Sequence, residues 1–131
     1  IPWYSVMYPA RYPEVIAVGA SNSFDELAEF TNVSEELDVT APGTEIISTN
    51  VWKWGGFGSC SGTSMATPHV TGAVAMMLAL DPELGVEDIR SILKGTADEL
   101  DNSPGIGEID LAQALKNVLS EIIKRIWRLR L

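Results

Sequence analysis

The residues best placed for chemistry lie in the stretch 62–72, which reads Gly-Thr-Ser-Met-Ala-Thr-Pro-His-Val-Thr-Gly. It opens an apolar run of small residues, which predicts a helix over 63–80 with Ser64 near its start. The unpaired N–H groups and the positive dipole end of a helix favour negative charge there. A serine that attacks a carbonyl creates such a charge on the carbonyl oxygen. The pattern therefore indicates a nucleophilic serine, and the alternative is that Thr63 or Ser64 only caps a buried helix.

A serine nucleophile needs a general base, and His69 is the only histidine in the chain. In one helix, five residues leave His69 about 140° round from Ser64 and about 7.5 Å along the axis. We therefore expect His69 to point away from Ser64 and to be packed or hydrogen-bonded inside the protein. The nucleophile elbow of α/β-hydrolases fits poorly as well, because that fold needs a histidine well downstream of the serine.

The elements that must position Ser64 begin with short strands. Apolar runs rich in β-branched residues predict strands at 15–20, 37–41 and 45–49. The polar segment 24–34 fits either a loop or a surface strand pair. Residues 52–58 are expected to form a glycine-rich aromatic loop that leads to the serine, because glycine permits unusual backbone angles and close approach.

Two further helices are expected after the central one. The first covers about 86–94, with acidic residues in its first turn and Gly95 at its end. Turn residues at 102–105 follow it. Asp110 is then the expected N-cap of the second helix, and Gln113 completes a capping box. Apolar positions at spacings of three and four predict that this helix has about 20 residues.

Charge is distributed unevenly along the chain, whose net charge is −9. Residues 1–120 carry 17 acidic and 5 basic side chains, a balance of −12, and residues 121–131 carry 1 acidic and 4 basic ones, a balance of +3. An acidic body argues against nucleic acid as a partner, because phosphates need a basic surface. It suits cation binding or simple solubility. The single cysteine excludes an intrachain disulfide.

The stretch 62–72 resembles the nucleophile segment of the subtilisin-like serine proteases, Gly-Thr-Ser-Met-Ala-x-Pro-His-Val-x-Gly. Two more segments resemble that family in the same order. They are 8–20, Tyr-Pro-Ala-Arg-Tyr-Pro-Glu-Val-Ile-Ala-Val-Gly-Ala, and 36–43, Glu-Leu-Asp-Val-Thr-Ala-Pro-Gly. The resemblance implies a three-layer α/β fold with a mostly parallel sheet, of which 1–115 would be the C-terminal part. It also implies a serine endopeptidase that hydrolyses protein or peptide substrates through an acyl-enzyme on Ser64.

In the resembled family, the histidine that corresponds to His69 is not the general base. The base, the acid and an oxyanion-hole asparagine come from segments upstream of 8–20, and none of these segments occurs here. Without a base, Ser64 is a poor nucleophile, so the chain alone is expected to be inactive. Activity would need the upstream half, in the same product or as a second chain. The alternative is an inactive fragment or binding module that acts through its C-terminal helix.

The resemblance also implies a weak site for calcium or a monovalent cation. Its ligands would be the carbonyl oxygens of Ala10, Tyr12 and Val15 and the carboxylate of Asp38, and oxygen ligands suit a hard cation. The alternative is that Asp38 caps a turn or faces water. Met7 falls where the family often has glycine at the floor of the primary specificity pocket, which would make the pocket shallow.

Residues 116–131 continue as an amphipathic helical extension beyond the point near Leu115 where a subtilisin-like domain usually ends. Such an extension can fold its apolar stripe onto the body, with its basic end over acidic surface. The alternative is a docking helix for a partner or an anionic membrane surface, because Trp127 and four basic residues flank an apolar face. The resemblance implies a secreted or extracellular protein, and an intracellular one stays open.

Overall fold

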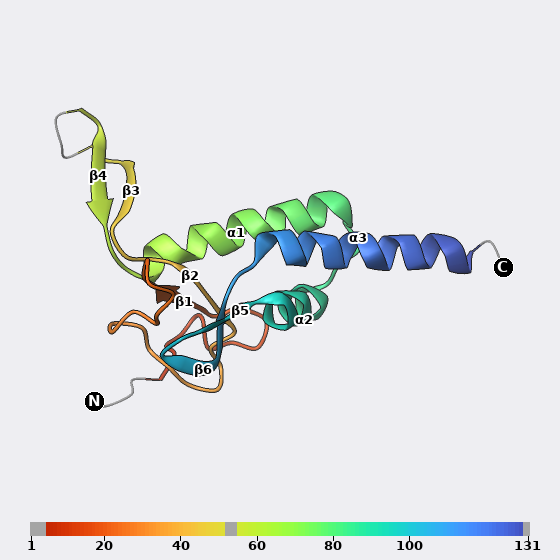
Figure 1. Ribbon diagram of the computed structural model, residues 1–131, viewed down its shortest axis with the longest axis horizontal. Helices are drawn as coiled ribbons and strands as arrows, with labels where there is room; N and C mark the ends of the chain where they lie inside the picture. Colours follow the sequence, from red (N-terminus) through yellow and green to blue (C-terminus); the bar gives the residue numbers. More distant parts are fainter. Residues whose placement is uncertain (1–4, 52–54, 130–131) are drawn as a thin grey trace.

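Helices packed on a mostly parallel sheet make up the part of the chain that the computed structural model describes, residues 5–51 and 55–129 (Figure 1). The elements in chain order are β1 (Val18–Ser21), β2 (Val39–Pro42), β3 (Ile46–Thr49), β4 (Phe57–Cys60), α1 (Thr63–Leu80), α2 (Val86–Thr96), β5 (Asp98–Leu100), β6 (Ser103–Glu108) and α3 (Leu111–Arg128). This architecture confirms the mixed α/β class predicted from the sequence.

The main sheet has the strand order β1-β2-β6-β5. β1 pairs in parallel with β2, with Val18 opposite Val39, and β2 pairs in parallel with β6, with Thr40 opposite Glu108. β5 is antiparallel to β6. β1 and β2 are almost wholly buried, which fits their short apolar sequences because a parallel strand is covered on both faces.

The core forms where α1 lies against β1 and β2. The buried face of α1 consists of Ala66, Val70, Ala73 and Met77. These residues recur at spacings of four, three and four, so they form one stripe along the helix. Leu93 of α2 and Val118 of α3 belong to the same core, and each is 1% exposed. Burial of side chains of this size stabilises the fold by roughly 1.5–3 kcal/mol each.

Several local predictions differ from the structure. The expected loop at 52–58 overlaps β4, which pairs with β3 in an antiparallel hairpin that extends away from the body, and residues 52–54 lie outside the described part (Figure 1). The expected turn at 102–105 is largely part of β6. Gly95 lies inside α2 rather than after it. The strands β4 and β6 are short and contain glycine or polar residues, so pairing with neighbouring strands determines them more than their own sequence does.

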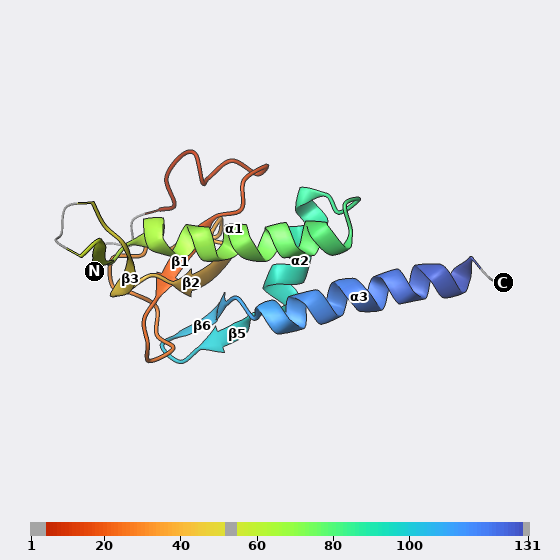
Figure 2. The same cartoon turned by 90° about the horizontal axis from the view of Figure 1, so that it is seen from above.

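α3 begins at the predicted N-cap, because the side chain of Asp110 accepts a hydrogen bond from the Gln113 N–H at 2.9 Å. The return bond from the Gln113 side chain, which the predicted capping box needs, is not formed among the described residues. Figure 2 shows α3 passing beside α1 and continuing beyond it. The expected packing of its apolar stripe onto the body holds as far as Ile122, which is half-buried. Arg125 then forms an ion pair with Asp81, whereas Trp127 is 65% exposed. The basic end therefore touches the body at one ion pair and otherwise projects from it.

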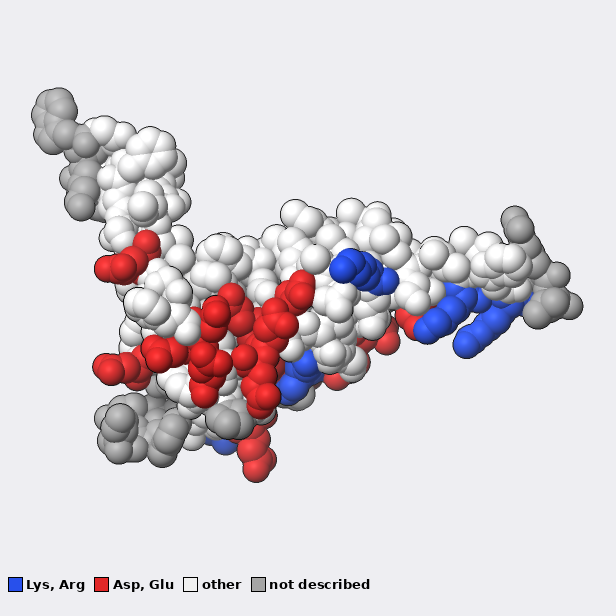
Figure 3. Space-filling model, viewed as in Figure 1, with Lys and Arg blue, Asp and Glu red and all other residues white. Residues whose placement is uncertain are grey.

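The uneven charge of the sequence is visible on the surface. Figure 3 shows acidic side chains gathered over the body and basic side chains along the far end of the molecule, where α3 ends. Among the helices of the described residues, none combines the length and the hydropathy that crossing a lipid bilayer requires.

Candidate active site

Ser64 lies in the first turn of α1, as the sequence predicts, and its side chain is exposed. The helix starts beside the carboxyl ends of β1 and β2, the edge at which open parallel sheets usually bind ligands (Figure 2). Within the described residues, neither the hydroxyl nor the backbone N–H of Ser64 has a hydrogen-bond partner. A free hydroxyl can attack a carbonyl once a base takes its proton, and a free N–H at a positive helix end can stabilise the oxyanion that forms.

Gly43 fixes the start of α1 against the sheet, and the sequence alone did not reveal this role. Its N–H donates to the Ser21 carbonyl at 3.0 Å, and its carbonyl accepts from the Gly62 N–H at 2.7 Å. A Cβ atom on Gly43 would lie 2.5 Å from the Ala20 Cβ and 2.9 Å from the Gly62 carbonyl oxygen. Glycine is therefore the residue that lets the end of β2 approach the turn before Ser64. The only sequence signal is that Gly43 follows Pro42 at the end of a predicted strand.

His69 makes no hydrogen bond to Ser64, in keeping with the prediction from helix geometry. Its Nδ1 atom lies 3.0 Å from the Met65 carbonyl oxygen, one turn back along α1. The expectation that His69 lies inside the protein is wrong, because the residue is exposed. It lies on α1 next to Val70, which belongs to the buried face of the helix, but is not itself part of that face. In the described part of the chain, no imidazole, carboxylate or amine is hydrogen-bonded to Ser64.

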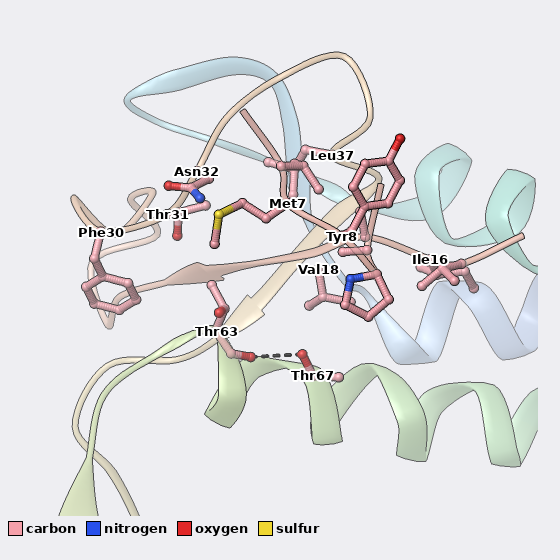
Figure 4. Close-up of a pocket in the computed structure, with 15 residues that line it drawn as sticks. Met7, Tyr8, Ile16, Val18, Phe30, Thr31, Asn32, Leu37, Thr63 and Thr67 are labelled. Atoms are coloured by element: carbon pink, nitrogen blue, oxygen red, sulfur yellow. Dashed lines mark hydrogen bonds between the residues drawn. The ribbon is translucent and has the colours of Figure 1, made fainter. Parts of the chain in front are cut away.

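A cavity of about 390 Å³ adjoins the start of α1 and includes Thr63, the neighbour of Ser64. Its walls come from segments 6–10, 15–18 and 30–32, which the fold brings together. Figure 4 shows Met7 extending across the cavity toward Thr31, above Thr63. Met7 is 69% exposed, so its thioether occupies open space rather than the core. The residue that the resemblance places at the floor of a specificity pocket thus lines a cavity beside the candidate nucleophile.

A second, mostly apolar groove of about 470 Å³ runs along α1. Its lining includes Val74 and Leu78 of α1, Ile89 of α2 and Ile16 just before β1. Exposed apolar grooves mark contact sites for another protein segment, a ligand or a membrane.

Of the residues predicted to hold a cation, Val15 and Asp38 meet at Arg90, and other groups of the protein engage most of the set. The Tyr12 carbonyl accepts from the Val15 N–H at 2.9 Å, and the Val15 carbonyl accepts from the Arg90 guanidinium at 3.0 Å. Asp38 accepts from the Ala17 N–H and pairs with Arg90. In this arrangement the set does not fit an added metal ion. Among the described residues, no cluster of three or more His, Cys, Asp or Glu residues could hold a metal.

Fold and site together define an α/β domain with an exposed serine at the carboxyl edge of a mostly parallel sheet. The chain belongs to the subtilase family, which it matches over residues 3–113. This match confirms the family predicted from the three segments, and it leaves residues 114–131 outside.

Individual relatives agree with the family assignment. The chain is 50% identical over 99 residues to subtilisin NAT from Bacillus subtilis subsp. natto. These 99 residues cover 76% of this chain and 26% of the relative. It is 48% identical over 99 residues to subtilisin from Bacillus pumilus, covering 76% of this chain and 35% of the relative. The chain therefore spans about a quarter to a third of the length of these relatives.

Solved structures show the same fold. A cold adapted subtilisin-like serine proteinase superposes with a TM-score of 0.64 at 36% identity, over 79% of this chain and 37% of that chain. A protease from Pseudoalteromonas arctica superposes with a TM-score of 0.73 at 26% identity, over 85% of this chain and 38% of that chain.

Proposed function

We propose that the chain is the nucleophile-bearing part of a subtilisin-type serine endopeptidase, with a protein or peptide as substrate. The observation that carries the proposal is the exposed Ser64 at the start of α1, with its hydroxyl and its N–H both free, beside a cavity that can take a substrate side chain. Membership of the subtilase family supports the same conclusion.

In the proposed reaction, the Ser64 Oγ attacks the scissile carbonyl carbon while a general base takes the hydroxyl proton. The carbonyl oxygen becomes an oxyanion, and the Ser64 N–H at the positive end of α1 stabilises it. Collapse breaks the C–N bond, and the leaving amine takes the proton back from the base. Water then attacks the Ser64 ester, which regenerates the serine and releases the acid. The cavity beside Thr63 holds the side chain next to the scissile bond.

The base must come from a segment that packs against this chain, because no suitable group reaches Ser64 among the described residues. Two exposed apolar surfaces of this chain are available for contact with such a segment. One is the open side of α1, where Met76 is 50% exposed, and the other is the apolar groove along Val74 and Leu78. We propose that the part of a subtilisin that precedes the matched segment covers them, either in the same product or as a second chain.

A fluorophosphonate label tests the need for this partner. We expect the 131-residue chain alone to label at Ser64 at least about 10³-fold more slowly than a complete site, because an unactivated serine hydroxyl is a poor nucleophile. Mass spectrometry of the labelled chain measures the rate. Adding the upstream part of subtilisin NAT as a separate polypeptide should raise it. Rapid labelling of Ser64 in the mass-verified chain alone would refute the requirement.

Met7 is expected to set the depth of the substrate cavity. The activity would be measured in a chimera in which this chain replaces the matching 99 residues of subtilisin NAT. We compare kcat/KM for two substrates, one with a large aromatic side chain and one with alanine before the scissile bond. Met7→Gly should raise the ratio of the first value to the second by roughly 10- to 100-fold, because the thioether no longer fills the space. Met7→Leu keeps the volume and serves as the control. An unchanged ratio in Met7→Gly would show that the cavity does not bind that side chain.

A further inference from the structure

Arg90 of α2 is the most fully engaged cation in the described part of the chain. Its Nε donates to Asp38 at 3.2 Å, its Nη1 pairs with Glu87, and its Nη2 donates to the carbonyl oxygens of Pro13 and, at 3.0 Å, Val15. The guanidinium therefore binds two carboxylates and two carbonyls at once. Its side chain is only 15% exposed. A flexible surface ion pair would not hold one group at four acceptors.

The acceptors of Arg90 overlap the ligands that a cation would need. Val15 and Asp38 belong to the predicted cation-binding set, and both are bonded to the guanidinium. Lys94 brings a second positive charge, with its Nζ 3.4 Å from the other carboxylate oxygen of Asp38. The side chains of Asp38 and Arg90 are 9% and 15% exposed, so water screens this pair little, whereas the exposed Lys94 is screened more.

We infer that Arg90 is a built-in replacement for a metal ion and holds the 8–15 loop in place without calcium or a monovalent cation. A hard cation binds oxygen donors that are free to turn toward it. Here the acceptors already face a guanidinium, which matches carboxylate and carbonyl geometry through several fixed N–H groups. An ion added beside Arg90 and Lys94 would meet two positive charges and would have to displace the guanidinium.

The charge of Arg90 is permanent. Its pKa is raised above the ordinary arginine value, mainly by the hydrogen bond to Glu87, and the hydrogen bond and charge of Asp38 add to the rise although burial acts against it. A guanidinium does not lose its proton at any pH that the fold survives. The replacement therefore differs from a bound ion in one respect, since neither dilution nor a chelator can remove it.

The loop that Arg90 holds also forms part of the candidate active site. Tyr8, Pro9, Ala10 and Val15 line the cavity beside Thr63, and Arg90 anchors the far end of this loop. Arg90 is thus a positioning residue for the cavity wall. This last step rests on the proposed function, whereas the replacement of the ion does not.

Hydrogen exchange of the 131-residue chain, read by mass spectrometry over residues 8–17, tests the inference. In the wild-type chain we expect the same exchange rate with a chelator, with millimolar calcium and with potassium. Arg90→Met should raise the rate by about tenfold or more, because it removes several charge-assisted hydrogen bonds. Millimolar calcium should then slow exchange in the variant, since Asp38 and the carbonyls of Pro13 and Val15 lose the guanidinium that competes with the ion.

Arg11→Met is the matched control, because it also removes an arginine–carboxylate pair from this loop. The Arg11–Glu36 pair spans 2.9 Å but is exposed, so its loss should cause little change and no response to calcium. If Arg90→Met also loosens α1, Arg90→Lys keeps the charge and should loosen only residues 8–17. Calcium that slows exchange in the wild type, with the effect lost in Asp38→Asn, would overturn the inference. An unchanged rate in both Arg90 variants would do so as well.

Discussion

Replacing Ser64 with alanine should abolish peptide hydrolysis by the chimera in which this chain takes the place of the matching part of subtilisin NAT. We expect kcat to fall by about 10⁶, the size of effect that removal of the nucleophile has in subtilisin itself. The reason is geometric. Ser64 supplies the only hydroxyl at the start of α1 that is exposed and without a hydrogen-bond partner among the described residues. Removal of Oγ leaves the oxyanion site and the cavity without an attacking atom.

The measurement is the rate of hydrolysis of a chromogenic peptide, with fluorophosphonate labelling as a second readout. Ser91→Ala is the matched control, because Ser91 is also exposed but lies on α2, and it should keep the activity. KM should change little in Ser64→Ala, since the cavity stays intact. Activity retained by Ser64→Ala above a trace of co-purified enzyme would mean that another group attacks the substrate.

The central part of the fold can be predicted because its signals are local. Helix α1 begins and ends at Thr63 and Leu80, as predicted, since a long apolar run is bounded by a glycine turn and an Asp-Pro pair. The strands β4, β5 and β6 could not be predicted in the same way. β6 contains two glycines and a proline, and it is a strand because β2 and β5 supply hydrogen-bond partners on both sides.

In the site, too, residues with a local sequence signal could be predicted, and residues placed by distant contacts could not. Ser64 could be placed from its motif, whereas the resemblance named Asp38 only as a cation ligand and did not predict its ion pair with Arg90. Arg90 is separated from Asp38 by 52 residues, and nothing in its own segment indicates that it reaches the loop before β1. His69 was expected inside because it points away from Ser64 along the helix, which leaves it a structural role. In the structure only one face of α1 meets the sheet, so His69 is exposed.

Gly43→Ala should weaken both the stability and the activity of the chimera. The new methyl group would meet the Ala20 Cβ at 2.5 Å and the Gly62 carbonyl oxygen at 2.9 Å, and both neighbours are fixed by the backbone. Relief requires β2 and the turn before α1 to move apart, which lengthens the bond from the Gly62 N–H to the Gly43 carbonyl. Overpacking of this kind costs roughly 1–3 kcal/mol, so Tm should fall by several degrees.

The activity of Gly43→Ala should fall by more than its loss of stability explains, because the turn that moves carries Ser64. A displacement of the nucleophile by about 1 Å costs on the order of 100-fold in rate, and kcat/KM measured well below the Tm isolates this effect. Gly95→Ala is the control. A methyl group there meets nothing within 4 Å, and alanine favours a helix over glycine by roughly 0.5–1 kcal/mol, so this variant should be slightly stabilised and fully active. If Gly43→Ala matched Gly95→Ala in both measurements, the contact between β2 and the turn would not be what positions Ser64.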